Sequence, residues 1–166
     1  MWMILITSGS NPSHVSELVL QLGKEFSMKD LGPLHLFLGV EVKYFDGGIH
    51  LSQSKYVAEL LDKTEMTFAK VIATHLDQKH GLHEAVESLV EASFYRMIVG
   101  SLQYLTLTRP YIIHVVNLAS QFMQNPNSSY LQGVKRILRY IKGTLHFGLR
   151  LISQSPCRLY GYSDAD

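Results

Sequence analysis

Basic side chains recur along one predicted helix at a spacing that could hold phosphate groups. Over residues 129–142 apolar residues form one stripe, while Lys135, Arg139 and Lys142 lie on another face with Arg136 beside them. Such a row can follow the phosphates of a nucleic acid without reading its sequence. The alternative is a core helix whose basic side faces water, and the sequence leaves both interpretations open.

A glycine between an arginine and a tyrosine marks a second candidate surface. Gly100 lies inside a predicted helix, where glycine costs about 1 kcal/mol relative to alanine, and Arg96 and Tyr104 stand four residues to either side. The missing side chain makes a flat place that a nucleic-acid backbone could approach closely. Tight packing against another helix would explain the glycine equally well.

Charge is distributed unevenly along the 166 residues. The formal net charge is +1, yet residues 1–92 carry −5 and residues 93–166 carry +6, with every arginine in the second part. Such a cationic half is compatible with a polyanionic partner, because neutralising phosphates releases counterions, although most modest basic surfaces are only solvated faces. With 46% hydrophobic residues the chain has the composition of a folded protein, which excludes wholesale disorder.

Residues for metal-dependent or nucleophilic catalysis are sparse. His75, His80 and His83 have no cysteine beside them, and their spacing fits no closed zinc site. The sequence holds no phosphate-binding loop and no G-x-S-x-G turn. Asp164 and Asp166 would share one face of a strand, but a single pair does not make a two-metal site. We therefore predict no complete catalytic constellation and no cofactor for this chain.

Turn and capping residues divide the chain into helices and strands. Asn11 and Pro12 favour the start of a helix that extends to about residue 26. Alternating apolar residues from Phe37 to Phe45, and again from Ile49, surround turn residues and predict a β-hairpin. A helix capped by Ser52 or Ser54 follows. Further helices are expected at residues 93–106, 110–123 and 129–142, strands at residues 1–7, 144–151 and 158–164, and an irregular connector at residues 64–90.

The sequence gives no sign of a membrane or of an oxidising compartment. Residues 1–7, the longest apolar opening, are too short to span a bilayer and lack the features of a signal peptide. Cys157 is the only cysteine, so no internal disulfide can form. These features predict an intracellular protein, cytoplasmic or nuclear, without a membrane partner.

Five ordered blocks of sequence resemble the reverse transcriptase of copia-type LTR retrotransposons, and the resemblance covers nearly the whole chain. They begin at Phe26, Phe37, Ile49, Tyr95 and Val134, with the sequences FSMKDLGPLH, FLGVEV, IHLSQSKY, YRMIVGSLQY and VKRILRYIKGT. The resemblance implies an α+β fold with a truncated palm, a β-hairpin, a helical thumb and connection, and short terminal strands. The implied domains are a palm remnant (residues 1–63), an acidic connector (64–92), a helical thumb and connection (93–155) and the start of ribonuclease H (156–166).

The resemblance also implies roles for single residues. Phe37, Leu38 and Gly39, with the hairpin that extends to Ser52, would belong to the primer grip, which holds the primer end. The helix with Arg96, Gly100 and Tyr104 resembles the thumb helix that tracks the minor groove of the primer–template duplex. The basic residues of the segment joining thumb to ribonuclease H would be Lys135, Arg136, Arg139 and Lys142. Asp164 resembles the first metal-binding carboxylate of ribonuclease H.

Polymerase activity is not expected of this chain alone. The family holds two Mg²⁺ ions with palm aspartates, two of them in a Tyr-Val-Asp-Asp turn just before a strand like residues 3–7, where this sequence has Met1, Trp2 and Met3. Two-metal transfer needs these carboxylates. We expect a fragment that at most binds RNA–DNA or DNA duplexes without sequence specificity. The alternative is a non-catalytic interaction module, for example one that associates with an intact polymerase, or a decayed element product with no nucleic-acid role.

Four positions depart from the family pattern. Leu36 stands where an aromatic residue is expected, His75 where a proline is, and Val115 where an alanine is. Tyr111 replaces an aspartate that would cap the helix beginning near Pro110, a role that tyrosine cannot take. That helix is therefore expected to begin without a side-chain cap.

Overall fold

The computed structural model describes three stretches of the chain, residues 11–27, 32–74 and 90–153. They belong to two compact units, residues 1–35 and residues 36–166. Several expected features lie outside the described residues: the strands at residues 1–7 and 158–164, the three connector histidines, and Asp164 with the segment that resembles ribonuclease H.

The first unit contributes one described helix, α1 (Pro12–Glu25). Its start is the predicted one: Asn11 is the N-cap, its side-chain oxygen accepts from the backbone N–H of Ser13 at 3.0 Å, and Pro12 is the first helical residue. This cap satisfies a backbone donor that the helix itself leaves unpaired. No side chain of α1 is buried.

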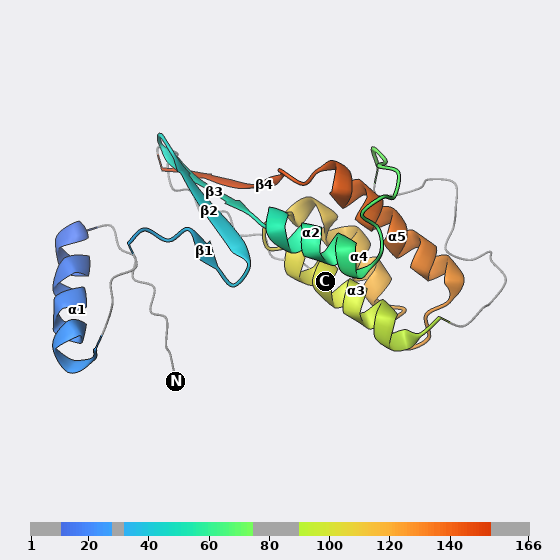
Figure 1. Cartoon of the computed structure of the whole chain (residues 1–166), viewed down its shortest axis with the longest axis horizontal. Helices are drawn as coiled ribbons and strands as arrows, with labels where there is room; N and C mark the ends of the chain where they lie inside the picture. The colour runs from blue at the N-terminus through green and yellow to red at the C-terminus, as the bar shows by residue number, and fades with distance from the viewer. Residues whose placement is uncertain (1–10, 28–31, 75–89, 154–166) are drawn as a thin grey trace, which may run out of the picture. The chain divides into compact units, whose positions relative to one another are not determined.

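The second unit contains a four-stranded antiparallel sheet with strands in chain order (Figure 1). Its strands are β1 (Leu36–Phe37), β2 (Val40–Phe45), β3 (Gly48–Ser52) and β4 (Gly148–Ile152). The predicted hairpin is confirmed as β2 and β3, and Gly47 takes the positive φ, +83°, that its turn requires.

The predicted strand from Phe37 was wrong in one respect, because it is interrupted at Leu38 and Gly39. Both residues have positive φ, +47° and +78°, and the pairing of Phe37 with Val40 makes them a two-residue hairpin turn. Two successive positive φ angles are what a tight turn between twisted strands needs. Because Leu38 is apolar, the hydrophobicity pattern does not indicate a turn at this position.

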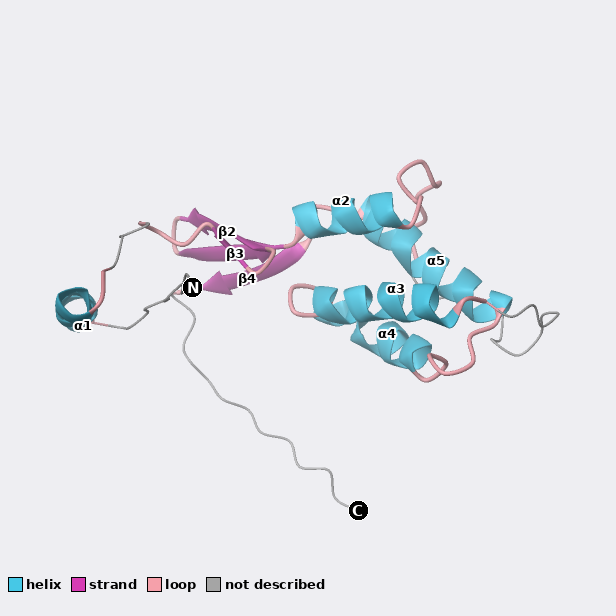
Figure 2. Cartoon of the chain, turned by 60° about the horizontal axis from the view of Figure 1, so that its bottom comes forward, coloured by secondary structure: helices cyan, strands magenta, loops and turns pink. Residues whose placement is uncertain are grey.

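The other described elements of the second unit are helices (Figure 2). They are α2 (Ser54–Lys63), α3 (Ala92–Leu105), the 3₁₀ turn η1 (Pro110–Ile112), α4 (Ile113–Ser120) and α5 (Ser128–Gly143). The chain is therefore α+β, as predicted.

Two helix predictions need correction at their starts. The residues expected to form one helix from Pro110 are divided into η1 and the shorter α4, and no side chain caps either start. α2 is not capped by a serine: Gln53 occupies the N-cap position without a side-chain cap bond, and the Ser54 hydroxyl donates to the carbonyl of Leu145 at 3.0 Å.

The last described strand is shorter than expected, since Thr144 ends α5 as its C-cap and β4 starts at Gly148. The carbonyl of Leu145 accepts hydrogen bonds from two other segments, so this stretch links helix and sheet and has no strand partner of its own. β4 pairs with β3 and thereby adds to the hairpin sheet a strand that follows all the helices of this unit in the sequence.

The hydrophobic core lies among α2, α3, α4 and α5. Its fully buried members include Val57, Ile98, Leu102, Val116, Leu138 and Ile141. Burying an aliphatic side chain of this size contributes about 1.5–3 kcal/mol. Tyr95 is buried among them, its hydroxyl donates to the carbonyl of Ala119 at 2.9 Å, and burial raises its pKa to about 12. This core fixes α3, so that the outward face of α3 is a rigid surface.

Candidate nucleic-acid interface

The structure brings together two predicted site regions that lie 66 residues apart in sequence. The Tyr104 hydroxyl, on α3, donates to the backbone carbonyl of Leu38 in the β1–β2 turn. The Tyr104 ring also meets the Tyr56 ring edge to face, with centroids 5.1 Å apart. A Cβ on Gly39 would lie 3.8 Å from the Tyr56 ring and 3.9 Å from the Tyr104 ring. The turn is therefore held against α3 by one hydrogen bond and two aromatic rings.

The apolar side chains of this turn remain open. Leu38 is 71% exposed and Phe37 36% exposed, although both are large hydrophobic residues. Their backbone is fixed by the sheet and by Tyr104, which lowers the conformational entropy that a partner would have to remove.

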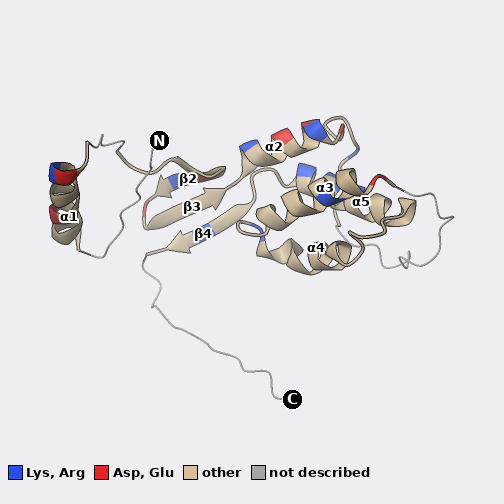
Figure 3. Cartoon of the chain, turned by 90° about the horizontal axis from the view of Figure 1, so that it is seen from below, with Lys and Arg blue, Asp and Glu red and all other residues tan. Residues whose placement is uncertain are grey.

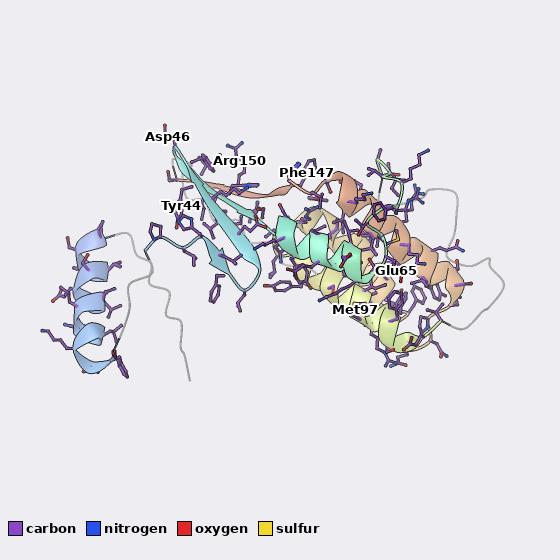
Figure 4. All side chains as sticks on the ribbon, in the orientation of Figure 1. Tyr44, Asp46, Glu65, Met97, Phe147 and Arg150 are labelled. Carbon is purple, nitrogen blue, oxygen red and sulfur yellow. The ribbon has the colours of Figure 1, made fainter. Side chains whose placement is uncertain are left out.

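The face of α3 around Gly100 is also open. Gly100 is exposed, and a Cβ placed there would meet no atom within 4 Å in the part of the chain that the structure describes. Packing against another described helix therefore does not explain this glycine. Arg96, one turn earlier, is exposed as well, and its Nε donates to the carbonyl of Met123 at 3.0 Å. Met97, also on α3 (Figure 4), is 38% exposed.

The basic residues of α5 lie along the connector. Lys142 Nζ donates to the carbonyl of Ala69 and Arg139 Nε to that of Lys70, each at 2.8 Å. Arg136 Nη2 donates to the Thr74 hydroxyl at 3.0 Å. Lys135 is exposed. Three of the four predicted phosphate contacts thus hold residues 69–74 against α5, and their role in nucleic-acid binding stays a prediction.

Sequence reasoning missed the glycine that makes this contact close. A Cβ on Gly143, the last residue of α5, would collide with Cγ1 of Val71. Glycine at this position lets the connector approach the helix end directly. In the sequence, Gly143 is simply a glycine at the end of a basic helix. Glycine is common at helix ends, so its position does not reveal the contact with the connector.

Sequence reasoning also missed Arg109, which is fully buried. Its Nη1 donates to the Thr144 hydroxyl and its Nη2 to the Leu145 carbonyl, each at 3.0 Å. Burial lowers the pKa of the guanidinium, and Tyr111 counteracts part of that effect. No carboxylate in the described residues pairs with it, so neutral oxygens of the chain itself solvate this charge.

The described residues contain no group of three His, Cys, Asp or Glu side chains that could hold a metal ion. A search of the same residues finds no helix both long and apolar enough to cross a bilayer.

Comparison with known proteins extends the sequence resemblance. Residues 3–78 match the family described as reverse transcriptase (RNA-dependent DNA polymerase). Over 165 residues the chain is 44% identical to the retrovirus-related Pol polyprotein from transposon RE1 of Arabidopsis thaliana, and over 163 residues it is 40% identical to an uncharacterized mitochondrial protein of the same plant. The chain belongs to the reverse transcriptase family of retrotransposon Pol polyproteins. The Pol polyprotein from transposon TNT 1-94 of Nicotiana tabacum is 34% identical over 172 residues.

This reverse transcriptase relative covers very different shares of those proteins. Each alignment includes 98% of the chain, yet it spans 11% of the RE1 polyprotein, 13% of the TNT 1-94 polyprotein and 68% of the mitochondrial protein. No solved structure matches the chain significantly.

Proposed function

We propose that this chain binds the sugar–phosphate backbone of a primer–template duplex, RNA–DNA or DNA, without reading its sequence. The surface would consist of the β1–β2 turn and the exposed face of α3. The contact between Tyr104 and Leu38 carries the proposal, because it joins the two regions that family resemblance separately relates to the primer and to the minor groove.

The chemistry of α3 supports duplex binding. Gly100 offers exposed backbone where a nucleic-acid backbone can come close. Arg96 supplies a cation on the same face, and its bond to Met123 limits the positions that its guanidinium can take. Contacts of this kind position a duplex and carry no sequence information.

We also propose that these 166 residues do not incorporate nucleotides by themselves. The printed sequence contains no adjacent pair of aspartates, and two-metal phosphoryl transfer needs carboxylates that fix both ions. Extension of a labelled primer by the purified chain in the presence of Mg²⁺, abolished by EDTA, would refute this part of the proposal.

Replacing Gly100 by glutamine tests duplex binding without damaging the fold. A Cβ at this position meets no described atom within 4 Å, and α3 should become more stable by about 0.5–1 kcal/mol because a helix-interior glycine is removed. The affinity for a labelled RNA–DNA hybrid, measured by fluorescence anisotropy, should fall by about tenfold, which corresponds to about 1.4 kcal/mol.

Gly23 provides the matched control, because it is also a helical glycine with open space around it. Gly23→Gln should leave the affinity for the hybrid unchanged. An unchanged affinity of Gly100→Gln, or a binding curve for the parent chain that does not respond to salt, would favour the non-catalytic interaction module instead.

A further inference from the structure

The register of the sheet places three basic residues side by side. Lys43 on β2 pairs with His50 on β3, and His50 pairs with Arg150 on β4. Directly paired residues of antiparallel strands project from the same face of the sheet. Lys43, His50 and Arg150 therefore form one row across three strands, which we name the sheet row. Figure 3 shows the basic positions on β2 and β4.

The sheet row has no acidic partner within the part of the chain that the structure describes. On the same face, Glu41 Oε1 accepts from the backbone N–H of Lys55 at 2.8 Å, and it pairs across the sheet with Ser52. Asp46 lies at the turn of the hairpin, at its tip (Figure 4). Lys43 and Arg150 flank His50 on this face, so an anion bound across the row would meet two cations and an imidazole whose ring nitrogens can bond to it.

An aromatic ring orients one end of the row. The guanidinium carbon of Arg150 lies 4.6 Å from the centroid of the Phe45 ring, within the range of a cation–π interaction. Lys43, Phe45, His50 and Arg150, together with Tyr44, line a shallow, open hollow. An open hollow suits a chain that passes across the sheet better than a small molecule, which prefers an enclosed pocket.

We infer that the sheet row is a second phosphate-binding surface, which takes the phosphodiester backbone of a nucleic acid. Neighbouring strands are about 4.8 Å apart, so the row spans about 10 Å. One strand of a duplex carries about one charge per 3.4 Å of its axis, so the row faces about three phosphates. The nature of the ligand rests on the proposed function, whereas the site itself rests on the register and charges of β2, β3 and β4.

The test removes the two exposed cations that end the row. In the Lys43→Gln/Arg150→Gln variant of the full 166-residue chain, affinity for the hybrid should fall about tenfold or more at low salt. The slope of log affinity against log salt concentration should become shallower by about 2, since each phosphate contact contributes about 0.9. The unfolding midpoint in urea should change little, because both side chains are exposed and the described contact that is lost is that of Arg150 with the Phe45 ring.

A charge-matched control removes two exposed lysines of α2, in Lys55→Gln/Lys63→Gln. Equal losses of affinity and slope in both double variants would overturn the inference, because then only net charge matters. Inorganic pyrophosphate is titrated in parallel by thermal shift. Stabilisation by pyrophosphate equal to that by the hybrid, at equal phosphate concentration, would overturn the assignment to a nucleic-acid backbone.

The outcome separates this inference from the proposed function. If Lys43→Gln/Arg150→Gln weakens binding while Gly100→Gln does not, the sheet row stands and the α3 surface fails. If only Gly100→Gln weakens binding, the sheet row fails and the α3 surface stands. Loss in both variants supports both surfaces.

Discussion

The two basic rows of this protein differ in what their charged atoms contact. On α5, Arg136, Arg139 and Lys142 donate to oxygens of residues 69–74. On the sheet, the side chains of Lys43, His50 and Arg150 make no hydrogen bond or ion pair within the described residues, and the Arg150 guanidinium lies over the ring of Phe45. Most basic side chains of the α5 row, which are close together in the sequence, therefore already donate to oxygens of the protein itself. The basic side chains of the sheet row, which are far apart in the sequence, remain available to a ligand.

The difference shows that charge spacing identifies a face but not its availability. A lysine or arginine side chain has several N–H donors, and a hydrogen bond to one carbonyl uses only one of them. The α5 row can therefore still donate hydrogen bonds to a phosphate. Its first task in the structure, however, is to hold an irregular segment that buries few side chains of its own.

The largest loss of stability is expected from separating β4 from the sheet. This change would also remove Arg150 from the sheet row. A Cβ on Gly148 would collide with the backbone carbonyl of Leu51 on β3, which cannot turn away as a side chain could. Gly148→Val should therefore lower the free energy of unfolding by about 3 kcal/mol, as overpacking does in a rigid site. Urea denaturation measures it, and an unfolding midpoint equal to that of the parent chain would show that β4 does not depend on this close approach.

An intermediate effect is expected from releasing the connector. Arg139→Met/Lys142→Met removes two charged donors from the carbonyls of Lys70 and Ala69, at a cost of about 1–2 kcal/mol because both groups are partly exposed to water. Cleavage by trypsin after Lys70 should become faster. If hybrid affinity drops tenfold while cleavage is unchanged, the α5 row contacts nucleic acid and the contrast between the two rows disappears.

The smallest effect concerns the fit between Gly143 and Val71. Gly143→Ala places a methyl group against the Val71 side chain, which is 46% exposed and can move aside. The free energy of unfolding should therefore fall by only about 0.5–1 kcal/mol. Val71→Ala should remove most of that loss when the two substitutions are combined. A double-mutant cycle with no coupling would mean that the connector does not lie against the end of α5 in solution.

Local signals in the sequence predicted the elements well where side chains act on their own backbone. Asn11 and Pro12 located the start of α1, and the glycines after Asp46 located the β2–β3 turn. The turn at Leu38 was not foreseeable from hydrophobicity. Its positive φ accompanies the pairing of Phe37 with Val40 and the hydrogen bond from the Tyr104 hydroxyl to the Leu38 carbonyl.

The parts of the candidate site that escaped prediction depend on contacts between distant segments. Spacing predicted that Arg139 and Lys142 share a face, but residues 64–90 have no periodicity that could place them there. Lys43 and Arg150 are 107 positions apart, and only the addition of β4 to the hairpin makes them neighbours of His50. Gly100 is an intermediate case: its flat surface was predictable, but it was not predictable that none of the described helices packs against it.

The peptide oxygen of Leu145 receives Arg109 from the corner before η1 and Ser54 from the first turn of α2. Two segments far apart in the sequence thus donate to one acceptor, three residues before β4 begins at Gly148. Displacing Leu145 together with the final strand would take one of two oxygens from the buried Arg109 guanidinium and leave it the Thr144 hydroxyl. The attachment of β4 therefore involves the helical bundle as well as the pairing of β4 with β3.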